Sequence, residues 1–337
     1  MKFMPGEKIL ITGGAGWSAR RERDHDRTAV QSRLSAQAPQ LQGEEYSVAA
    51  RLGSEKNQIM DTDLTARAGA PALHPHIDDY YGRRFNEVDR LGAGALGRLE
   101  RERTKELLSR FLPAAPARIL DVGGGPGVYA LWLASLGYEV LLIDPVARHV
   151  EQAAQYGTFA AQQGDARNLA ASDASADVVL LLGPLYHLVD AAERAQALRE
   201  ARRVVRPGGL IAAAFISRQA PIVEVAAQLG ANDDRIYDIL STLRDRGEND
   251  FESGFTVAYF HTVEEIREDF ATSGLDEPTL FGIEGPLLPL LASRLVDDRP
   301  DYLEAAVRAA RLADDHAALL PASAHLLAVT RAPGQRA

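Results

Sequence analysis

The sequence predicts an α/β protein built on a doubly wound, mostly parallel seven-stranded sheet with helical lid and cap segments. Short apolar runs alternate with helical stretches of about 10 to 15 residues between residues 118 and 218, and this alternation indicates βαβ crossovers in a parallel sheet. The first run, ILDVGGGPGV at 119–128, ends in a glycine-rich turn, the local form of a nucleotide-binding strand and loop. A hydrophobic content of 46% allows a large buried core.

Composition narrows the range of functions. The 337 residues correspond to about two domain-sized units or to one enlarged α/β domain. The chain has no cysteine and a net charge of −10, which excludes thiolate chemistry and argues against nucleic acid as a partner. The longest apolar runs, such as 178–186, are shorter than the roughly 20 residues of a membrane-spanning helix. No secretion signal is evident, so we expect a cytoplasmic protein without membrane contact.

Three segments of the chain differ in character. Residues 1–60 hold three of the four lysines and lack apolar periodicity after Trp17, so we expect an atypical, weakly ordered leader. Residues 61–112 are expected to form an N-terminal helical lid, and 113–337 the core with a cap insertion at about 218–260. The cap interrupts the alternation of strands and helices and has helical spacing, which suits a segment that covers a cleft.

The elements of the core follow in order. An amphipathic helix over 97–112 ends at Pro113 and Pro116, because proline cannot continue a helix. A later helix within 261–274 has Thr262 as its expected N-cap and Gly274 just after its end. We expect the other helices of the alternation at 128–137, 148–157 and 192–205. The first strand and its turn are expected at 118–125, and a short strand just before 164. The other strands are expected at 138–144, 177–183, 206–217, 278–285 and 323–332. These strands complete a Rossmann-like sheet.

A glycine-rich loop follows the first strand of the core. Asp121 leads the pattern D-x-G-x-G-x-G, whose glycines are Gly123, Gly125 and Gly127. Glycine has no side chain, so a ligand can lie against the backbone of such a loop. A tight strand-to-helix turn without a ligand is the alternative interpretation of the loop alone.

Two more acidic residues are predicted at the same edge of the sheet. Asp144 ends the next strand, 17 residues beyond Gly127, where a carboxylate can accept hydrogen bonds from both hydroxyls of a ribose. Its alternative role is to cap the helix that follows. Asp165 lies in GDA at 164–166, one crossover later, where its carboxylate could take the amino group of adenine.

Together these motifs resemble the class I S-adenosylmethionine-dependent methyltransferases over roughly 118–218. The resemblance implies that the three glycines lie under the methionine part of the donor, with Asp121 near its amino end. It also implies that Asp144 binds the ribose, and we assign Pro145 to the same site. Asp165 and Ala166 would bind adenine. The turn RPGG at 206–209, before the fifth strand, also matches the family.

Two oxidoreductase families share part of these patterns. A nicotinamide enzyme would have G-x-G-x-x-G after the first strand, whereas this loop is G-x-G-x-G. The leader sequence KILITGGAGW at 8–17 resembles the opening of nucleotide-sugar epimerases over Thr12–Gly16. That resemblance stops within ten residues, and the chain has no Tyr-x-x-x-Lys, the catalytic pair of that family. We therefore favour S-adenosylmethionine as the ligand.

The loop after the fourth strand carries the expected catalytic groups. In LLGPLYHL at 181–188, His187 is the candidate general base or acceptor-orienting group, although a purely structural histidine is the alternative. Tyr186 and, from the lid, Tyr81 complete the catalytic set. Metal-dependent catechol-type methyltransferases place carboxylates in and after this loop, and 180–189 contains none, so we expect no metal. An Asn-Pro-Pro-Tyr signature is also absent, which counts against DNA and protein glutamine as acceptors.

The predicted lid carries aromatic and charged residues in HPHIDDYYGRRFNEVDRL at 74–91. Tyr80, Tyr81, Phe85 and Arg90 could touch the donor or the acceptor, with Tyr80 assigned to the donor. The alternative is that each packs against the core. With the cap, they would enclose a partly aromatic pocket suited to a small molecule.

These observations predict a metal-independent methyltransferase that acts on a small, aromatic or otherwise apolar metabolite and releases S-adenosylhomocysteine. The protein is expected to be a monomer or a homodimer. A non-catalytic binder of S-adenosylmethionine or S-adenosylhomocysteine, acting as a partner subunit, is the alternative from another class. An epimerase-like, NAD-dependent oxidoreductase is a third hypothesis, and it depends on the leader alone.

Overall fold

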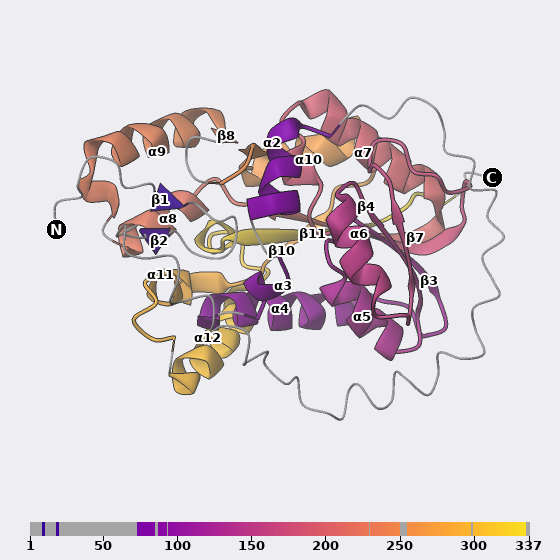
Figure 1. Cartoon of the computed structure of the whole chain (residues 1–337), viewed down its shortest axis with the longest axis horizontal. Helices are drawn as coiled ribbons and strands as arrows, with labels where there is room; N and C mark the ends of the chain where they lie inside the picture. Colours follow the sequence, from indigo (N-terminus) through magenta and orange to yellow (C-terminus); the bar gives the residue numbers. More distant parts are fainter. Residues whose placement is uncertain are drawn as a thin grey trace, which may run out of the picture.

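A seven-stranded sheet forms the centre of the computed structural model (Figure 1), which describes residues 9–10, 18–19, 73–84, 87–92, 94–228, 230–249, 255–297 and 299–334. Its strand order is β10-β11-β7-β6-β3-β4-β5. The strands are β3 (Arg118–Val122), β4 (Glu139–Asp144), β5 (Ala160–Gln163), β6 (Ala176–Leu181), β7 (Val205–Ile216), β10 (Thr279–Gly282) and β11 (His325–Arg331). The predicted α/β class and the seven strands are confirmed.

Strand direction places a crevice in the middle of the sheet. The five strands from β7 to β5 are parallel, and β11 runs antiparallel to both β7 and β10. From β3 the chain crosses to β4 on one side, and after β5 it returns to β6 on the other. The loops that leave the carboxyl ends of β3 and β6 therefore diverge, and ligands of open α/β sheets bind at such a switch point.

Side chains alternate between the two faces of the sheet because successive residues of a strand point in opposite directions. On β4, Leu141 and Ile143 belong to one buried cluster, and Val140 and Leu142 belong to another. The first cluster includes residues of α7 (Ala191–Val204) and α10 (Val263–Thr272), and the second includes residues of α4 (Gly94–Ser109), α5 (Val128–Ser135) and α6 (Ala147–Ala154). Both faces are therefore covered by helices.

A third buried cluster lies beyond the sheet, on the left in Figure 1. It unites α8 (Ala220–Ala227), α9 (Asp234–Arg246), α11 (Leu288–Ala292) and α12 (Pro300–Ala313) with the start of α4. The expected helical character of the cap is confirmed by α8 and α9, and the cap also contains the antiparallel pair β8 (Glu248–Asn249) and β9 (Ala258–Tyr259). Helices α11 and α12 were not predicted from the sequence, although α12 begins at a proline and has apolar residues at helical spacing.

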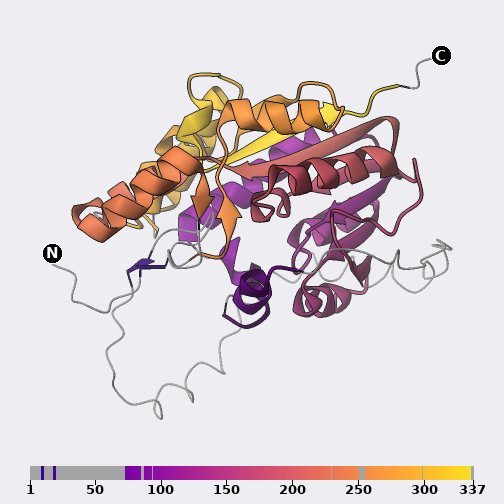
Figure 2. The same ribbon diagram turned by 90° about the horizontal axis from the view of Figure 1, so that it is seen from above.

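The lid consists of short helical pieces at the carboxyl end of the parallel strands. They are α2 (Pro75–Asp79), the π-helical turn η1 (Tyr80–Arg84) and α3 (Glu87–Arg90). Figure 2 shows the same lid pieces, in violet, from above. The 3₁₀ turns of the described residues are η2 (Leu185–His187), η3 (Gly230–Asn232), η5 (Gly285–Leu287) and η6 (Leu320–Ala322).

Most local expectations for the described residues agree with the structure. Thr262 and Glu265 form a complete capping box at the start of α10, and Gly274, just beyond its end, has a φ of 70°. Helix α4 begins at Gly94, three residues before the expected start, and ends at Ser109. Among the described residues, no helix is long and apolar enough to cross a membrane.

The leader does not open a parallel βαβ unit where the structure describes it. In the leader-sequence region, Ile9–Leu10 pairs antiparallel with Ser18–Ala19, forming β1 and β2. The TGGAG motif at 12–16, the rest of the leader and the start of the predicted lid at 61–72 lie outside the described residues.

A buried ion pair joins α4 to the end of α12. Arg103 is fully buried, and its Nη2 donates to Asp314 Oδ2 at 2.6 Å. Arg110, seven residues later and just past the end of α4, donates to the same oxygen at 2.8 Å. Arg103 also pairs with Glu106 at 2.7 Å. Removing the Asp314 carboxylate therefore takes a charged hydrogen-bond partner from two guanidinium groups and leaves the buried Arg103 with one counterion instead of two.

Replacing Asp314 with alanine should therefore destabilise the protein by about 2 kcal/mol or more, since hydrogen bonds between charged groups are lost. Asp301→Ala is the matched control, since Asp301 forms an exposed pair with Arg299 at the other end of α12, and such pairs contribute roughly 0 to 1 kcal/mol. Urea unfolding followed by circular dichroism measures both. Equal losses of stability in the two variants would contradict this account.

Candidate functional site

The glycine loop between β3 and α5 adopts a conformation that other residues seldom reach. Gly123, Gly125 and Gly127 have φ values of 71°, 57° and 92°, in the left-handed region where a Cβ causes strain. Space is also restricted, because a Cβ on Gly123 would lie 2.7 Å from Pro184 and one on Gly124 would lie 2.6 Å from the Asp121 carboxylate. The loop therefore presents backbone, with the loop after β6 packed closely against it.

A cavity of ≈ 860 Å³ opens beside this loop, at the carboxyl ends of β3, β4 and β6. Lid, core and cap all contribute to its wall. From the lid come Leu73, Ile77, Tyr81, Glu87 and Arg90; from the core come Asp121, Gly123, Gly125, Asp144, Pro145, His149, Asp165, Ala166, Arg167, Tyr186, His187 and Glu193; and from the cap come Glu248 and Val257. Residues of the predicted lid and of the predicted cap therefore both line this cavity.

Asp144 links the glycine loop to the next helix. Its Oδ2 accepts a hydrogen bond from the backbone N–H of Gly125 at 2.8 Å. Its Oδ1 accepts one from the backbone N–H of Val146 at 2.9 Å and one from His149 Nδ1 at 3.1 Å. Val146 is the N-cap residue of α6, which has no side-chain cap, so Asp144 bonds the residue just before the helix and a side chain of its first turn while it also lines the cavity.

Asp165 is held by an arginine that follows it closely. Arg167 donates to both of its oxygens, from Nε at 2.9 Å and from Nη2 at 2.6 Å. The same guanidinium reaches Glu193 of α7 at 2.6 Å. These bonds fix the orientation of the Asp165 carboxylate on the wall, next to Ala166.

Asp121 differs from the other acids because its carboxylate makes no hydrogen bond. It has an exposed fraction of 0%, and both oxygens lack a partner among the described residues. Burial, together with the nearby charge of Asp144, raises the pKa of Asp121 to about 7. A buried carboxylate without a partner is costly, so this group is suited to pair with a cationic or hydrogen-bond-donating ligand in the cavity that it lines.

The lid and the core meet at a hydrogen bond between Tyr81 and His187. Tyr81 Oη lies 2.9 Å from His187 Nε2, and His187 Nδ1 lies 3.1 Å from the carbonyl oxygen of Val257 in the cap. Burial lowers the pKa of His187 to about 4, so the imidazole is neutral at neutral pH. Burial also raises the pKa of Tyr81 well above its usual value, so the phenol keeps its proton.

Two predicted site residues lie away from the cavity wall. Tyr80 is buried in the cluster shared by lid and cap, where its ring packs edge-on against Phe255 and Tyr81. Its assignment to the donor is not supported by this position, because the neighbouring Tyr81 faces the cavity instead. Gly127 begins α5, and a Cβ there would lie 2.8 Å from Phe159. Phe85 lies outside the described residues.

Several residues of the cavity wall were not predicted from the sequence. His149 follows Asp144 by five residues and Arg167 follows Asp165 by two, and both spacings place a hydrogen-bonding group next to an acid that was already singled out. Glu87 belongs to the predicted lid, and its Cγ would lie 3.7 Å from a Cβ on Gly125. No local pattern marks Val257, because only its backbone carbonyl makes the contact with His187.

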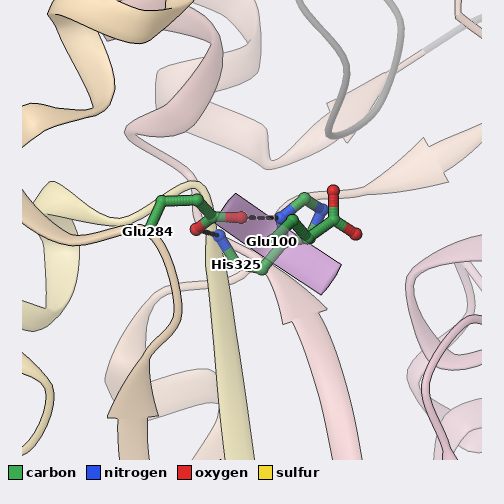
Figure 3. Close-up of side chains that lie close together, drawn as sticks. All are labelled: Glu100, Glu284 and His325. Atoms are coloured by element: carbon green, nitrogen blue, oxygen red, sulfur yellow. Dashed lines mark hydrogen bonds and ion pairs between the residues drawn. The ribbon is translucent and has the colours of Figure 1, made fainter. Parts of the chain in front are cut away.

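A buried ionic network supports the wall behind Arg90. Arg90 donates to both oxygens of Glu100 at 2.8 and 2.6 Å. Close by, His325 Nδ1 lies 2.6 Å from Glu284 Oε1, and Glu284 Oε2 accepts bonds from Ser323 Oγ and the His325 backbone N–H. Figure 3 shows Glu100, Glu284 and His325 converging from a helix, a loop and a strand, with ligand-type atoms within 4.8 Å of one another.

The cations of this network have carboxylate partners within the protein. Burial opposes a charge on His325, but the carboxylates of Glu100 and Glu284 raise its pKa to about 9. His325 is therefore an imidazolium at neutral pH, and Arg90 pairs with both Glu100 and Glu87. Because Arg90 also lines the cavity, the network fixes one part of the wall.

The glycine loop after β3 and the acids after β4 and β5 lie where the resemblance to class I S-adenosylmethionine-dependent methyltransferases implies. Residues 120–213 match the family model described as a methyltransferase domain. This match runs from β3 to β7, across the parallel part of the sheet.

Curated relatives share part of this chain. It is 32% identical over 152 residues to an uncharacterized methyltransferase of Mycobacterium tuberculosis, an overlap covering 43% of this chain and 60% of the relative. It is 37% identical over 111 residues to a ubiquinone biosynthesis O-methyltransferase of Methylocella silvestris, covering 32% of this chain and 42% of the relative. The chain thus matches these two relatives over roughly half of their length.

Solved structures give weaker similarity over a larger share of the chain. An S-adenosylmethionine-dependent methyltransferase of Methanosarcina mazei is 17% identical with a TM-score of 0.46, covering 68% of this chain and 98% of the other. One from Mesorhizobium loti is 19% identical with a TM-score of 0.45, covering 69% and 99%.

The raised pKa of His325 predicts a pH-dependent contribution to stability. A histidine with a folded pKa of about 9 and an unfolded pKa of about 6.5 stabilises the fold fully below pH 6.5 and loses that contribution as pH rises through 9. His325→Gln should therefore be less stable than the wild type by about 2 to 3 kcal/mol at pH 6, and the gap should narrow towards pH 9.

Urea unfolding at several pH values measures this difference. The exposed His316→Gln serves as the matched control and should leave the pH profile unchanged. A gap between His325→Gln and wild type that stays constant from pH 6 to pH 9 would show that His325 is not charged in the folded protein.

Proposed function

We propose that this protein transfers a methyl group from S-adenosylmethionine to a small, aromatic or otherwise apolar metabolite, without a metal. One observation carries the proposal: a single cavity joins the glycine loop and the unpartnered carboxylate of Asp121 to the hydrogen-bonded pair of Tyr81 and His187. The first part has the chemistry needed to hold the donor. The second supplies polar groups for an acceptor at the end of β6.

The residues of the donor half fit S-adenosylmethionine. The ligand carries an ammonium group, and Asp121 is a buried carboxylate without a hydrogen-bond partner on the wall of the cavity. A carboxylate has about four lone-pair sites, and Asp144 uses three of them for Gly125, Val146 and His149. We therefore propose that Asp144 accepts one ribose hydroxyl rather than both. Asp165, Ala166 and Pro145 are proposed to border the adenine.

When bound, S-adenosylmethionine supplies an electrophilic methyl group on a sulfonium. Displacement at that carbon requires the acceptor in line with the leaving sulfur and shielded from water. Tyr186 and Tyr81 border the space for the acceptor, together with the apolar residues Ile77, Leu188 and Val257. Such a wall suits an apolar molecule with a few polar contacts. The Methylocella relative is an O-methyltransferase, which favours oxygen as the atom that is methylated.

Metal independence is proposed from the state of the acids near the acceptor space. Asp190 lines the cavity, but its Oδ1 accepts from the backbone N–H of Ala192 as the N-cap of α7. Glu193 is paired with Arg167. Asp190 and Glu193 already bond to protein groups, so a divalent cation would have to break those bonds before it could bind either carboxylate.

A non-catalytic binder of the same ligand is the second candidate, because donor binding alone needs only the glycine loop and the acids. The polar Tyr81–His187 pair on the opposite wall favours the enzyme. The epimerase-like hypothesis depends on the leader motif, most of which lies outside the described residues.

The function can be tested by incubating the purified full chain with S-adenosylmethionine and a metabolite extract. Release of S-adenosylhomocysteine that depends on the extract and persists in EDTA would support the metal-independent enzyme. Tight binding of S-adenosylhomocysteine without extract-dependent turnover would support the binder. Loss of turnover in EDTA that Mg²⁺ restores would contradict the absence of a metal.

The position of Asp121 predicts that ligand affinity depends on pH. Since the pKa of Asp121 is about 7 in the free protein, pairing with the ligand's ammonium group requires loss of a proton below pH 7. The affinity for S-adenosylhomocysteine should therefore rise by about tenfold per pH unit between about pH 5.5 and pH 6.5, and level off above pH 7. Asp121→Asn should bind weakly and without this dependence.

Isothermal titration calorimetry in buffers of different ionisation enthalpy measures both the affinity and the proton release. Asp173→Asn is the control, because Asp173 is an exposed acid remote from the cavity wall. If wild type and Asp121→Asn bind S-adenosylhomocysteine equally at pH 7.5, Asp121 does not contact the amino group.

A further inference from the structure

The hydrogen bonds around His187 can run in one direction only. A carbonyl oxygen cannot donate, so the His187 Nδ1 that lies 3.1 Å from Val257 O must carry the ring proton. In a neutral imidazole the other nitrogen is then an acceptor. The Tyr81 hydroxyl at 2.9 Å must therefore donate its proton to His187 Nε2.

This direction decides what Tyr81 offers to a ligand. A phenol has one proton and two acceptor lone pairs, and here the proton is committed to His187. Towards the cavity, which both side chains line, the Tyr81 oxygen can act only as a hydrogen-bond acceptor. The lid, the core loop and the cap each supply one member of the chain Tyr81, His187 and Val257, so the direction is fixed by three separate segments.

We infer that the methyl acceptor carries an O–H or N–H group at its reacting atom and donates that hydrogen to Tyr81. This inference rests on the proposed function and names the substrate class: a neutral hydroxyl compound or amine. A carboxylate, a tertiary amine or a thioether has no hydrogen to donate, and its lone pairs would face those of the Tyr81 oxygen. The same contact would orient the reacting lone pair of the acceptor.

The arrangement also gives the departing proton a path. The acceptor's lone pair forms the new bond to the methyl carbon, and the carbon–sulfur bond breaks with its electron pair remaining on sulfur. The acceptor's proton passes to the Tyr81 oxygen as the Tyr81 proton passes to His187 Nε2. The products are the methylated acceptor, S-adenosylhomocysteine and an imidazolium on His187, which later releases its proton to water.

The timing of this transfer follows from the basicity of the imidazole. A buried, weakly basic His187 is unsuited to ionise a neutral hydroxyl before the reaction. Once the acceptor atom bonds to the methyl group it becomes positively charged, and its proton becomes strongly acidic, so a weak base suffices. Tyr81 and His187 therefore act together with methyl transfer and not before it.

A pair of probe molecules tests the inference in the full-length protein saturated with S-adenosylhomocysteine. Phenol and anisole share the ring and the oxygen, but only phenol has an O–H. Their dissociation constants can be measured by ligand-observed NMR titration. We expect phenol to bind about five- to tenfold more tightly than anisole, as a net hydrogen bond implies. In Tyr81→Phe this preference should fall to about one, since phenylalanine cannot accept the hydrogen.

Tyr237→Phe is the matched control. Tyr237 lies on α9 with an exposed fraction of 59%, so its substitution should keep the full preference for phenol. The affinity of each variant for S-adenosylhomocysteine and its thermal unfolding are measured alongside. They show whether a lost preference reflects the hydroxyl or a damaged fold.

Two outcomes overturn the inference. One is a wild type that binds phenol no better than anisole, which includes no saturable binding of either probe. The other is a folded Tyr81→Phe that keeps the preference. The wild-type comparison needs no variant and so stands even if Tyr81→Phe does not fold. Failure of the wild type to bind S-adenosylhomocysteine is a different result, because it contradicts the proposed function itself.

Discussion

The site depends above all on the carboxylate of Asp144 at the end of β4. One of its oxygens holds the backbone of Gly125, and the other holds Val146 and His149 at the start of α6. Two loops that leave neighbouring strands are thereby tied to one buried group. A glycine loop with three left-handed residues has many conformations in an unfolded chain, and this carboxylate helps to select the one that borders the cavity.

Lid and cap extend this organisation to the opposite wall. Tyr81 reaches His187, His187 reaches Val257, and Arg90 is held by Glu100 from the interior side. Each contact joins segments more than 65 residues apart except the last, which spans ten. The cavity is therefore assembled from distant parts of the chain, and its polar groups have defined orientations because buried partners determine them.

Much of the fold and part of the candidate site could be predicted from the sequence. The features that could not be predicted have physical causes. The strands and the glycine loop were predictable because continuous apolar runs and glycines in a turn leave local signatures, as in Leu141, Leu142 and Gly123. The use of Asp144 was not decidable, since the same position fits a group that binds a ligand and a group that bonds the next helix. The burial of Tyr80, the carbonyl of Val257 and the pairing of Arg103 with Asp314 depend on tertiary contacts that have no local signal. Helix α11, with five residues, is too short to show a helical period, whereas α12 has a proline at its start and apolar residues at helical spacing and was overlooked.

The antiparallel strand β11 has a consequence for how the protein is made. It lies between β7 and β10, so β10, although synthesised earlier, has no partner in the sheet until β11 has been inserted. During synthesis the strand β7, with buried apolar residues from Leu210 to Ile216, is therefore left as an open sheet edge. Such edges pair readily with other chains. Nascent chains of this fold are thus most exposed to aggregation, and most in need of chaperones, in the interval before β11 emerges from the ribosome.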